Sequence, residues 1–313
     1  MLTVLPLWPL WLLIRKQIHE IEGISVMKNI LKPVYLFILL AICLFCINCT
    51  DQQKTNAPSP VGYDLNNPVK YNMPDELTEI SGIVFDEDNP QLIYAEQDED
   101  GRLFYFKPGD KNVKSVKFAG HGDYEDVAIS NRHVIMLRSD GTLYTFRLGP
   151  AESGEVNSKK QDKLLPAGEY EGLYGDNDGS IYALCKHCSI EKTSKTTTVF
   201  TLKLSADGTL TNAGQNTIDV KKIEQLTGVK KISFHPSALA KNPQTGEWYI
   251  LSSVNKLLVL ADADWNVKSV YPLNPSIFRQ PEGMAFDRDN NLYISNEGDK
   301  LSPGNVLKFT FKK

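Results

Sequence analysis

Acidic side chains recur in this chain at one point of a repeated phrase, where together they could bind a metal ion. In each copy of the phrase a polar residue precedes a small residue and a short apolar run. The polar residues of the five copies are Ser81, Glu125, Glu171, Ser237 and Glu282. A second column, two residues earlier, contains Glu79, Asp123, Glu169, His235 and Gln280. Because side chains alternate along a strand, we expect both columns to face the same side.

Carboxylates crowded into one site repel each other and are partly protonated unless a cation lies among them. Calcium accepts about six to eight oxygen ligands in a loose geometry, whereas magnesium requires strict octahedral order. We therefore predict a calcium site at Glu125, Glu171 and Glu282. Glu79 is either a further ligand or a solvated residue at the edge of this site.

Three other polar residues of the two columns have structural interpretations. Ser81 and Ser237 are expected to bond the backbone of a neighbouring repeat and so to connect the repeats. His235 is either a packed, hydrogen-bonded side chain or a general base for a water molecule that the ion holds. The sequence contains no Gly-x-Ser-x-Gly elbow, Walker-type loop, dinucleotide-binding glycine motif or His-Glu-x-x-His motif. Ordinary serine hydrolases and nucleotide-binding proteins are therefore disfavoured.

The elements around the phrase are short strands separated by turn signals. Each phrase is followed by further apolar runs, with hairpin signals such as Asp100-Gly101 and Asp140-Gly141 between them. Four antiparallel strands repeated at this period predict the blade of a β-propeller. Successive residues of the first column are 44, 46, 66 and 45 positions apart. We interpret the long interval as one blade with an insertion between about residues 187 and 231.

These repeats predict an all-β fold, a five-bladed β-propeller of four-stranded antiparallel blades. A six-bladed propeller, with the insertion as a degenerate blade, is the alternative, but it needs another copy of the phrase. An open last blade would expose a sheet edge, so residues 61–72 are expected to supply its missing outer strand. The first strand of each blade lines the central channel, where both columns converge. The ends of the second strands bring a ligand-binding rim to the same mouth: Glu96, Arg138, Lys186, Asn296 and Glu297.

The composition is that of a globular protein with an ample core. Of the 313 residues, 42% are hydrophobic and 23% are charged. The formal net charge is −4, and no long basic block occurs. These features argue against nucleic acid as a partner. We expect a monomer.

The N-terminal part has the layout of an exported protein. A basic start at Met27 precedes an apolar run and Cys49, an arrangement that resembles the signal of a bacterial lipoprotein. We predict a signal peptide over residues 27–48 and lipidation of Cys49, with an uncleaved signal anchor as the alternative. Residues 1–26 carry a second apolar stretch, and we interpret them as an over-long gene start. Residues 49–66 predict a flexible tether, followed by the propeller domain over residues 67–313.

A lipid anchor places the domain in the cell envelope, outside the cytoplasm and on the inner or the outer membrane. Cys185 and Cys188 are the cysteines that remain in the folded part. In an oxidising compartment two nearby thiols tend to pair. A redox pair or half of a zinc site is also conceivable from the spacing, but no second Cys/His cluster has zinc spacing. We expect a structural disulfide or free thiols rather than catalysis.

The copies of the phrase also form a recognisable set, consisting of Glu79-Ile-Ser-Gly82, Tyr124-Glu-Asp126, Tyr170-Glu-Gly172, His235-Pro-Ser-Ala238 and Pro281-Glu-Gly283. Behind a lipoprotein-like leader, this set resembles the SdiA-regulated family of bacterial envelope proteins over roughly residues 66–313. The resemblance implies a five-bladed propeller with bound calcium, distantly similar to NHL-repeat and esterase-like phytase propellers. It also implies that the ion lies nearest Glu125, Glu171 and Glu282, with Glu79 and His235 behind them.

Two classes of function remain open. The first is an envelope-tethered, calcium-binding module that recognises a small molecule or a protein at the channel mouth. The second is a calcium-dependent esterase or phosphoesterase, in which the ion polarises the bond and a glutamate or His235 acts as base. The first is favoured, because the sequence offers many acids but neither a convincing nucleophile nor a phosphate-binding Arg/Lys cluster.

Overall fold

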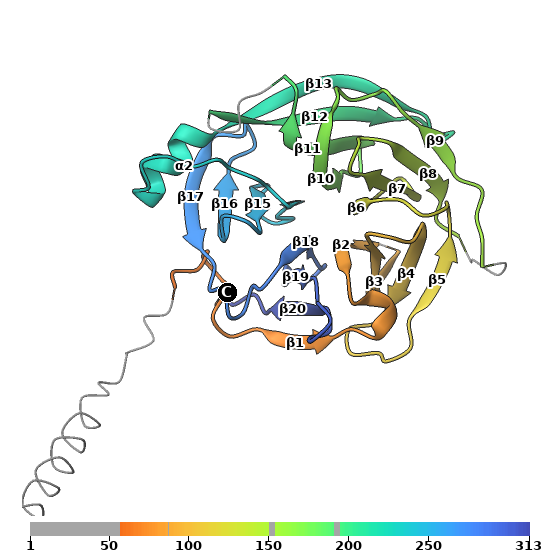
Figure 1. The fold of residues 1–313 in the computed structure, drawn as a ribbon, viewed down its shortest axis with the longest axis horizontal. Helices are drawn as coiled ribbons and strands as arrows, with labels where there is room; N and C mark the ends of the chain where they lie inside the picture. Colours follow the sequence, from red (N-terminus) through yellow and green to blue (C-terminus); the bar gives the residue numbers. More distant parts are fainter. Residues whose placement is uncertain (1–56, 87, 150–153, 191–194) are drawn as a thin grey trace, which may run out of the picture. The chain divides into compact units, whose positions relative to one another are not determined.

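The computed structural model describes residues 57–86, 88–149, 154–190 and 195–313. In this part of the chain, five four-stranded antiparallel sheets surround a central channel as the blades of a β-propeller (Figure 1). The all-β, five-bladed fold predicted from the repeats is confirmed. The same residues form no sixth sheet, so the six-bladed alternative is wrong.

Each blade starts with the strand next to the channel and continues outward. Blade 1 consists of β2 (Ile80–Asp86), β3 (Asn89–Gln97), β4 (Arg102–Phe106) and β5 (Lys114–Lys117). Blade 2 consists of β6 (Tyr124–Ser130), β7 (His133–Arg138), β8 (Leu143–Arg147) and β9 (Lys159–Gln161). Blade 3 consists of β10 (Gly168–Gly175), β11 (Ser180–Cys188), β12 (Thr196–Leu204) and β13 (Leu210–Asp219). Blade 4 consists of β14 (Ala238–Lys241), β15 (Trp248–Ser252), β16 (Leu257–Ala261) and β17 (Val267–Pro272).

Blade 5 joins the two ends of the propeller domain. It consists of β18 (Pro281–Phe286), β19 (Leu292–Asn296), β20 (Asn305–Phe309) and, as its outer strand, β1 (Val69–Asn72). β1 pairs antiparallel with β20, from Val69 opposite Lys308 to Asn72 opposite Asn305. A short 3-10 helix, η1 (Asp75–Leu77), then leads into blade 1. The predicted closing strand is confirmed, and without it β20 would be an open edge.

The long interval between the third and fourth phrases belongs to blade 3. Its outer strands β12 and β13 have 9 and 10 residues, and α2 (Val220–Thr227) follows β13 directly. The side chain of Asp219 caps α2 by accepting a hydrogen bond from the backbone N–H of Lys221. Gly228 ends the helix with a left-handed φ of 73°. The insertion therefore extends one blade and adds a helix beside it.

The core consists of apolar clusters between neighbouring blades. Each of the five clusters in the described ranges combines side chains of two consecutive blades. The cluster between blades 3 and 4, for example, contains Val199, Leu239, Trp248 and, from α2, Ile223. Burial of these faces is the main stabilising contribution. Because it joins every blade to the next, it also fixes the first strands around the channel.

Residues 57–66, which we expected to be the end of a flexible tether, pack against the propeller. Tyr63 and Leu65 are buried between blades 4 and 5. The hydroxyl of Tyr63 donates to the carbonyl of Asn290 at 2.7 Å, and the amide of Asn242 donates to this hydroxyl at 3.3 Å. Asn242 and Asn290 lie in the turns after β14 and β18. The described chain therefore begins at the end of the propeller where the first strands finish.

The predicted gene start, signal peptide and lipidated Cys49 lie outside the described residues, as does the tether up to residue 56. Among the residues that are described, no helix has the length and apolar character needed to cross a membrane. The location in the envelope stays a prediction.

Candidate functional site

Three first strands carry a β-bulge at the acidic position of the repeated phrase. In β6, Tyr124 and Asp126 pair with adjacent residues of β7, so Glu125 is the extra residue between them. Glu171 in β10 and Glu282 in β18 are extra residues in the same way. A bulge re-aims the side chain of its extra residue and interrupts the regular alternation of the strand.

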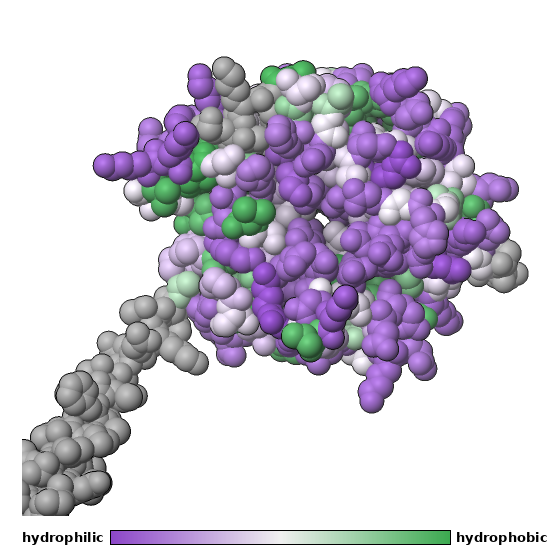
Figure 2. Space-filling model, in the orientation of Figure 1, coloured by the Kyte–Doolittle hydropathy of each residue, from purple (hydrophilic) through white to green (hydrophobic). Residues whose placement is uncertain are grey.

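The bulges separate the two columns of polar residues, which we expected to face the same side of their strands. Glu171 is buried and Glu125 and Glu282 are half-buried, whereas Asp123 and Glu169 of the second column are exposed. The three acids of the first column come from blades 2, 3 and 5 and act on each other electrostatically. They therefore converge at one mouth of the channel. Figure 2 shows that polar side chains surround the channel opening on the face in view.

The three converging carboxyl groups are poorly solvated and repel one another. Burial raises the pKa of Glu125 to about 9, and the charge of Glu171 adds to this rise. Burial, followed by the charge of Glu171, raises the pKa of Glu282 to about 8. Burial also raises the pKa of Glu171, although Lys186 opposes the rise. A site with this excess of negative charge favours protons or other cations.

Lys186 supplies a positive charge within this group. Its ammonium group forms a hydrogen-bonded ion pair with Glu171. Burial lowers the pKa of Lys186, but the pairing with Glu171 and the charges of Glu125 and Glu282 outweigh burial and raise it overall. We call Glu125, Glu171, Glu282 and Lys186 the acidic mouth. Lys186 was expected at the rim, but its pairing with a predicted metal ligand was not foreseen.

A disulfide between Cys185 and Cys188 flanks Lys186. Both sulfur-bearing side chains are buried. In the ladder of blade 3, Cys185 lies opposite Tyr170 and Cys188 opposite Gly168. Of the two states that the sequence left open, a structural disulfide and free thiols, the structure has the disulfide, which fixes the backbone on both sides of Lys186.

A metal ion requires these carboxylates to be closer together than they are. Within the part of the chain that the structure describes, no three His, Cys, Asp or Glu side chains are grouped closely enough to hold one. The donor chemistry nevertheless suits calcium, because the mouth offers several acidic oxygens and surplus negative charge. The structure thus brings Glu125, Glu171 and Glu282 to one mouth, and calcium binding stays a prediction.

Glu79, the fourth predicted ligand, belongs to a second acidic group. Its charge raises the pKa of both Asp98 and Glu297 beyond the effect of burial. Burial, Glu79 and Glu297 together raise the pKa of Asp98 to about 7. Asp98 was missed from the sequence. Its position directly after β3, beside the end of a predicted second strand, was the available signal.

The predicted ligand rim reaches the surface only in part. Glu96 and Asn296 have no exposed surface, which corrects their placement on the rim. Glu96 instead accepts a hydrogen bond from the backbone N–H of Gly82 at 2.6 Å. The amide group of Asn296 donates to the side chain of Asn305 at 3.1 Å and to the carbonyl of Ile277 at 3.4 Å. Arg138 and Glu297 are partly exposed.

His235, the candidate base, lies at the edge of the acidic mouth. Burial lowers its pKa, and the charges of Lys186 and His187 lower it further. Its Nε2 atom is 3.1 Å from the hydroxyl of Ser233, and its backbone N–H donates to the side chain of Asn255. These are the contacts of a hydrogen-bonded side chain, and its role as a base stays a prediction.

Polar side chains of the first strands also connect the blades, as expected for the two serines. Ser81 and Ser237 each donate at 2.9 Å to a backbone carbonyl of the next blade. The buried carboxylate of Asp126 accepts from the backbone N–H of Leu173 in the next blade at 2.6 Å. These bonds position the first strands, and with them the acids, relative to one another.

Comparison with known proteins decides the family. A sequence model of the SdiA-regulated family matches residues 69–301, which is most of the propeller. The chain belongs to the SdiA-regulated family. The resemblance drawn from the repeated phrases is thereby confirmed. No curated protein matches this SdiA-regulated chain significantly.

Several solved structures are similar to this SdiA-regulated propeller. Glutaminyl cyclase of Myxococcus xanthus is 15% identical, with a TM-score of 0.52 over 78% of this chain and 96% of that chain. A luciferin-regenerating enzyme is 12% identical, with a TM-score of 0.48 over 78% and 95%. Regucalcin, a calcium-binding protein of Agrobacterium tumefaciens, is 12% identical, with a TM-score of 0.46 over 80% and 95%. At these identities the likeness concerns the fold alone.

Proposed function

We propose that this propeller is a binding module of the cell envelope whose acidic mouth takes up calcium and recognises a small molecule or a protein. The observation that supports the proposal is the surplus charge of the mouth. Glu125, Glu171 and Glu282 are poorly solvated and share the ammonium group of Lys186. Desolvated carboxylates are costly without a counter-cation, and a divalent cation supplies the charge that Lys186 leaves unbalanced.

The members of the mouth have different roles in this proposal. Glu125 and Glu282 are the principal ligands, because burial and repulsion raise their pKa values without a bonded cation. Glu171 is shared between the ion and Lys186. The bulges in β6, β10 and β18 present all three carboxylates from the rigid inner strands of three blades.

Calorimetric titration of the purified protein with calcium tests this site. We expect one ion to bind with a Kd between about 1 µM and about 1 mM, the range of sensors and extracellular modules. Glu125→Gln combined with Glu282→Gln should weaken binding at least about tenfold. The matched control combines Glu247→Gln with Asp289→Asn, in turns at the other end of the first strands. Unchanged uptake in the mouth variant contradicts the proposal.

The location in the envelope is part of the same proposal. It rests on the signal-like segment before Cys49, and the disulfide between Cys185 and Cys188 supports it, because disulfides persist in oxidising compartments. Mass spectrometry of the mature protein is expected to find lipid on Cys49. An N-terminus that still carries Met27, without lipid, contradicts the anchor.

The enzymatic alternative can be separated from the binding module by a simple screen. p-Nitrophenyl acetate and p-nitrophenyl phosphate are incubated with the protein, with and without calcium. We expect no turnover above that of the Glu125→Gln, Glu282→Gln variant. Calcium-dependent turnover that is lost in His235→Ala would favour the esterase.

A further inference from the structure

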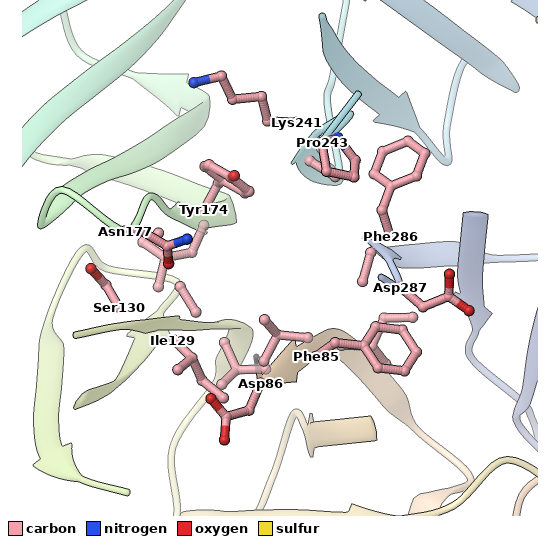
Figure 3. Close-up of a pocket in the computed structure, with 18 of the residues that line it drawn as sticks. Phe85, Asp86, Ile129, Ser130, Tyr174, Asn177, Lys241, Pro243, Phe286 and Asp287 are labelled. Carbon is pink, nitrogen blue, oxygen red and sulfur yellow. The ribbon is translucent and has the colours of Figure 1, made fainter. Parts of the chain in front are cut away.

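A cavity of about 420 Å³ opens at the end of the channel opposite the acidic mouth. The last residues of all five first strands line it, among them Phe85, Ile129, Tyr174 and Phe286 (Figure 3). Val127 and Ile129, two and four residues after Glu125 in β6, both line it, so its lining lies about 7 Å to about 13 Å along the strand from the acidic mouth. We call this cavity the far pocket.

Aromatic side chains give the far pocket a stiff apolar wall. Phe85, Tyr174 and Phe286 are each partly exposed at the cavity. Behind the cavity they are buttressed by other rings: Phe85 packs on Tyr293 at 4.9 Å and Tyr174 packs on Trp248 at 5.3 Å between ring centres. Partly exposed rings that are fixed from behind form a preorganised surface for the flat face of a ligand.

The charged side chains that line the far pocket balance each other, with three acids and three bases: Asp86, Asp88, Asp287, Arg132, Lys241 and Arg288. The ammonium group of Lys241 is 2.8 Å from the carboxylate of Asp176. Arg132 contacts Asp88 at 2.5 Å. Asp287 accepts a hydrogen bond from the hydroxyl of Tyr293. A charged ligand gains little here, because the opposite charges of the lining offset each other.

Polar contacts for a ligand come from the backbone instead. Each first strand is the end strand of its sheet, so its side toward the channel has no strand beside it. The far pocket is therefore an apolar wall crossed by the edges of five strands. The edge N–H and C=O groups that do not already bond a side chain, as those of Val127 and Leu173 do, can bond a carbonyl or hydroxyl group of a ligand. A pocket of this kind combines flat apolar contact with a few directional hydrogen bonds.

We propose that the far pocket binds a small uncharged molecule of two or three fused rings that carries carbonyl or hydroxyl groups at its edge. The size follows from the volume, since a cavity of about 150 Å³ accepts one benzene ring. The ligand is uncharged because acids and bases balance in the lining, and its polar edge groups match the strand edges. This site is separate from the acidic mouth and does not depend on calcium.

Three probes that share one ring system test the charge preference. They are uncharged 2-naphthol, anionic 2-naphthoate and cationic 2-naphthylmethylamine, titrated into the purified protein and followed by equilibrium dialysis. We expect 2-naphthol to bind at least about tenfold more tightly than either charged probe, with or without a calcium chelator. Equal affinity for the three probes, or no binding of 2-naphthol, overturns the proposal.

A substitution that fills the far pocket tests whether 2-naphthol binds there. Ile129→Trp adds bulk at a partly exposed wall position. Val254→Trp introduces the same side chain at a position that is 69% exposed, in the turn between β15 and β16. We expect Ile129→Trp to weaken 2-naphthol binding at least about tenfold, while Val254→Trp leaves it unchanged. Equal binding by the two variants overturns the location.

A second measurement decides the case if Ile129→Trp does not fold. Uncharged 2-azidonaphthalene is photolysed with the wild-type protein, and the labelled peptides are identified by mass spectrometry. We expect the label in the last residues of β2, β6, β10, β14 and β18, and excess 2-naphthol should prevent it. Labelling elsewhere, or labelling that 2-naphthol does not reduce, also overturns the proposal.

Discussion

At the scale of single residues, the acidic mouth is a place where carboxyl groups keep protons into the neutral pH range. Glu125 and Glu282 carry pKa values of about 9 and about 8, because burial and the neighbouring Glu171 disfavour their charged forms. The ordinary value for a glutamate is about 4.3. Protons, Lys186 and an added cation are therefore alternative ways to neutralise the same side chains.

We expect the free energy of unfolding, measured without calcium, to fall from about pH 5 to about pH 8. Since the folded pKa values of Glu125 and Glu282 lie above their unfolded values, the native protein binds more protons than the unfolded chain in this range. The stabilisation is complete below the unfolded pKa and is lost as the pH rises toward the folded pKa. Urea unfolding at several pH values measures it. Glu125→Gln with Glu282→Gln should flatten the profile, and an unchanged slope contradicts this origin.

Lys186→Met is expected to destabilise the calcium-free protein by about 2 kcal/mol near neutral pH, because it leaves Glu171 and its neighbours without their internal cation. This loss in the free energy of unfolding is smaller than that expected for a fully buried ion pair, since the Lys186 side chain is 30% exposed. Lys241→Met is the matched control, because its pair with Asp176 has side chains that are 27% and 30% exposed at the other end of the channel. Thermal unfolding compares the two. Equal losses would show that the acidic mouth has no special need for the cation.

At the scale of elements, the repeats predicted the blades because every blade buries the same two faces, and this requirement recurs in the sequence. The closing strand followed from the cost of an open edge. The bulges at Glu125, Glu171 and Glu282 could not be predicted, because one extra residue leaves the apolar pattern of a strand almost unchanged. The far pocket has no motif at all, since backbone edges and scattered rings from five strands form it.

Removal of the disulfide by Cys185→Ser with Cys188→Ser is expected to cost at most about 2 kcal/mol, since it closes a very short loop. We expect the loss of the disulfide to change the backbone around Lys186 more than the stability of the whole domain. We expect faster amide hydrogen exchange at Lys186 and His187, whose backbone the disulfide fixes. Hydrogen exchange followed by mass spectrometry measures this, with wild-type protein under reductant as the comparison. Unchanged exchange in both samples contradicts a positioning role.

At the scale of the whole molecule, one channel connects two sites of opposite character. The acidic mouth lies where the first strands begin, and the far pocket lies where they end. The described chain enters beside the far pocket, through Tyr63 between blades 4 and 5. A partner bound at the acidic mouth therefore approaches the propeller from the end opposite this entry.

Two truncations test how much the entering segment contributes to the ring. A protein that starts at Ala57 should unfold with the same free energy as the longer chain. A protein that starts at Met73 loses Tyr63, Leu65 and β1, and should be destabilised by more than about 4 kcal/mol or fail to fold. Urea unfolding and size-exclusion chromatography measure both. A stable monomer that starts at Met73 contradicts closure by β1.

Closure by β1 also decides how the ring bears mechanical load. A pull on the chain before Ala57 reaches blade 5 through Tyr63 and then through β1, which runs antiparallel beside β20. Tension along β1 loads its backbone hydrogen bonds in shear, so they resist together instead of opening one after another. The pairing of β1 with β20 therefore resists a pull that would peel away an edge strand whose bonds opened one by one.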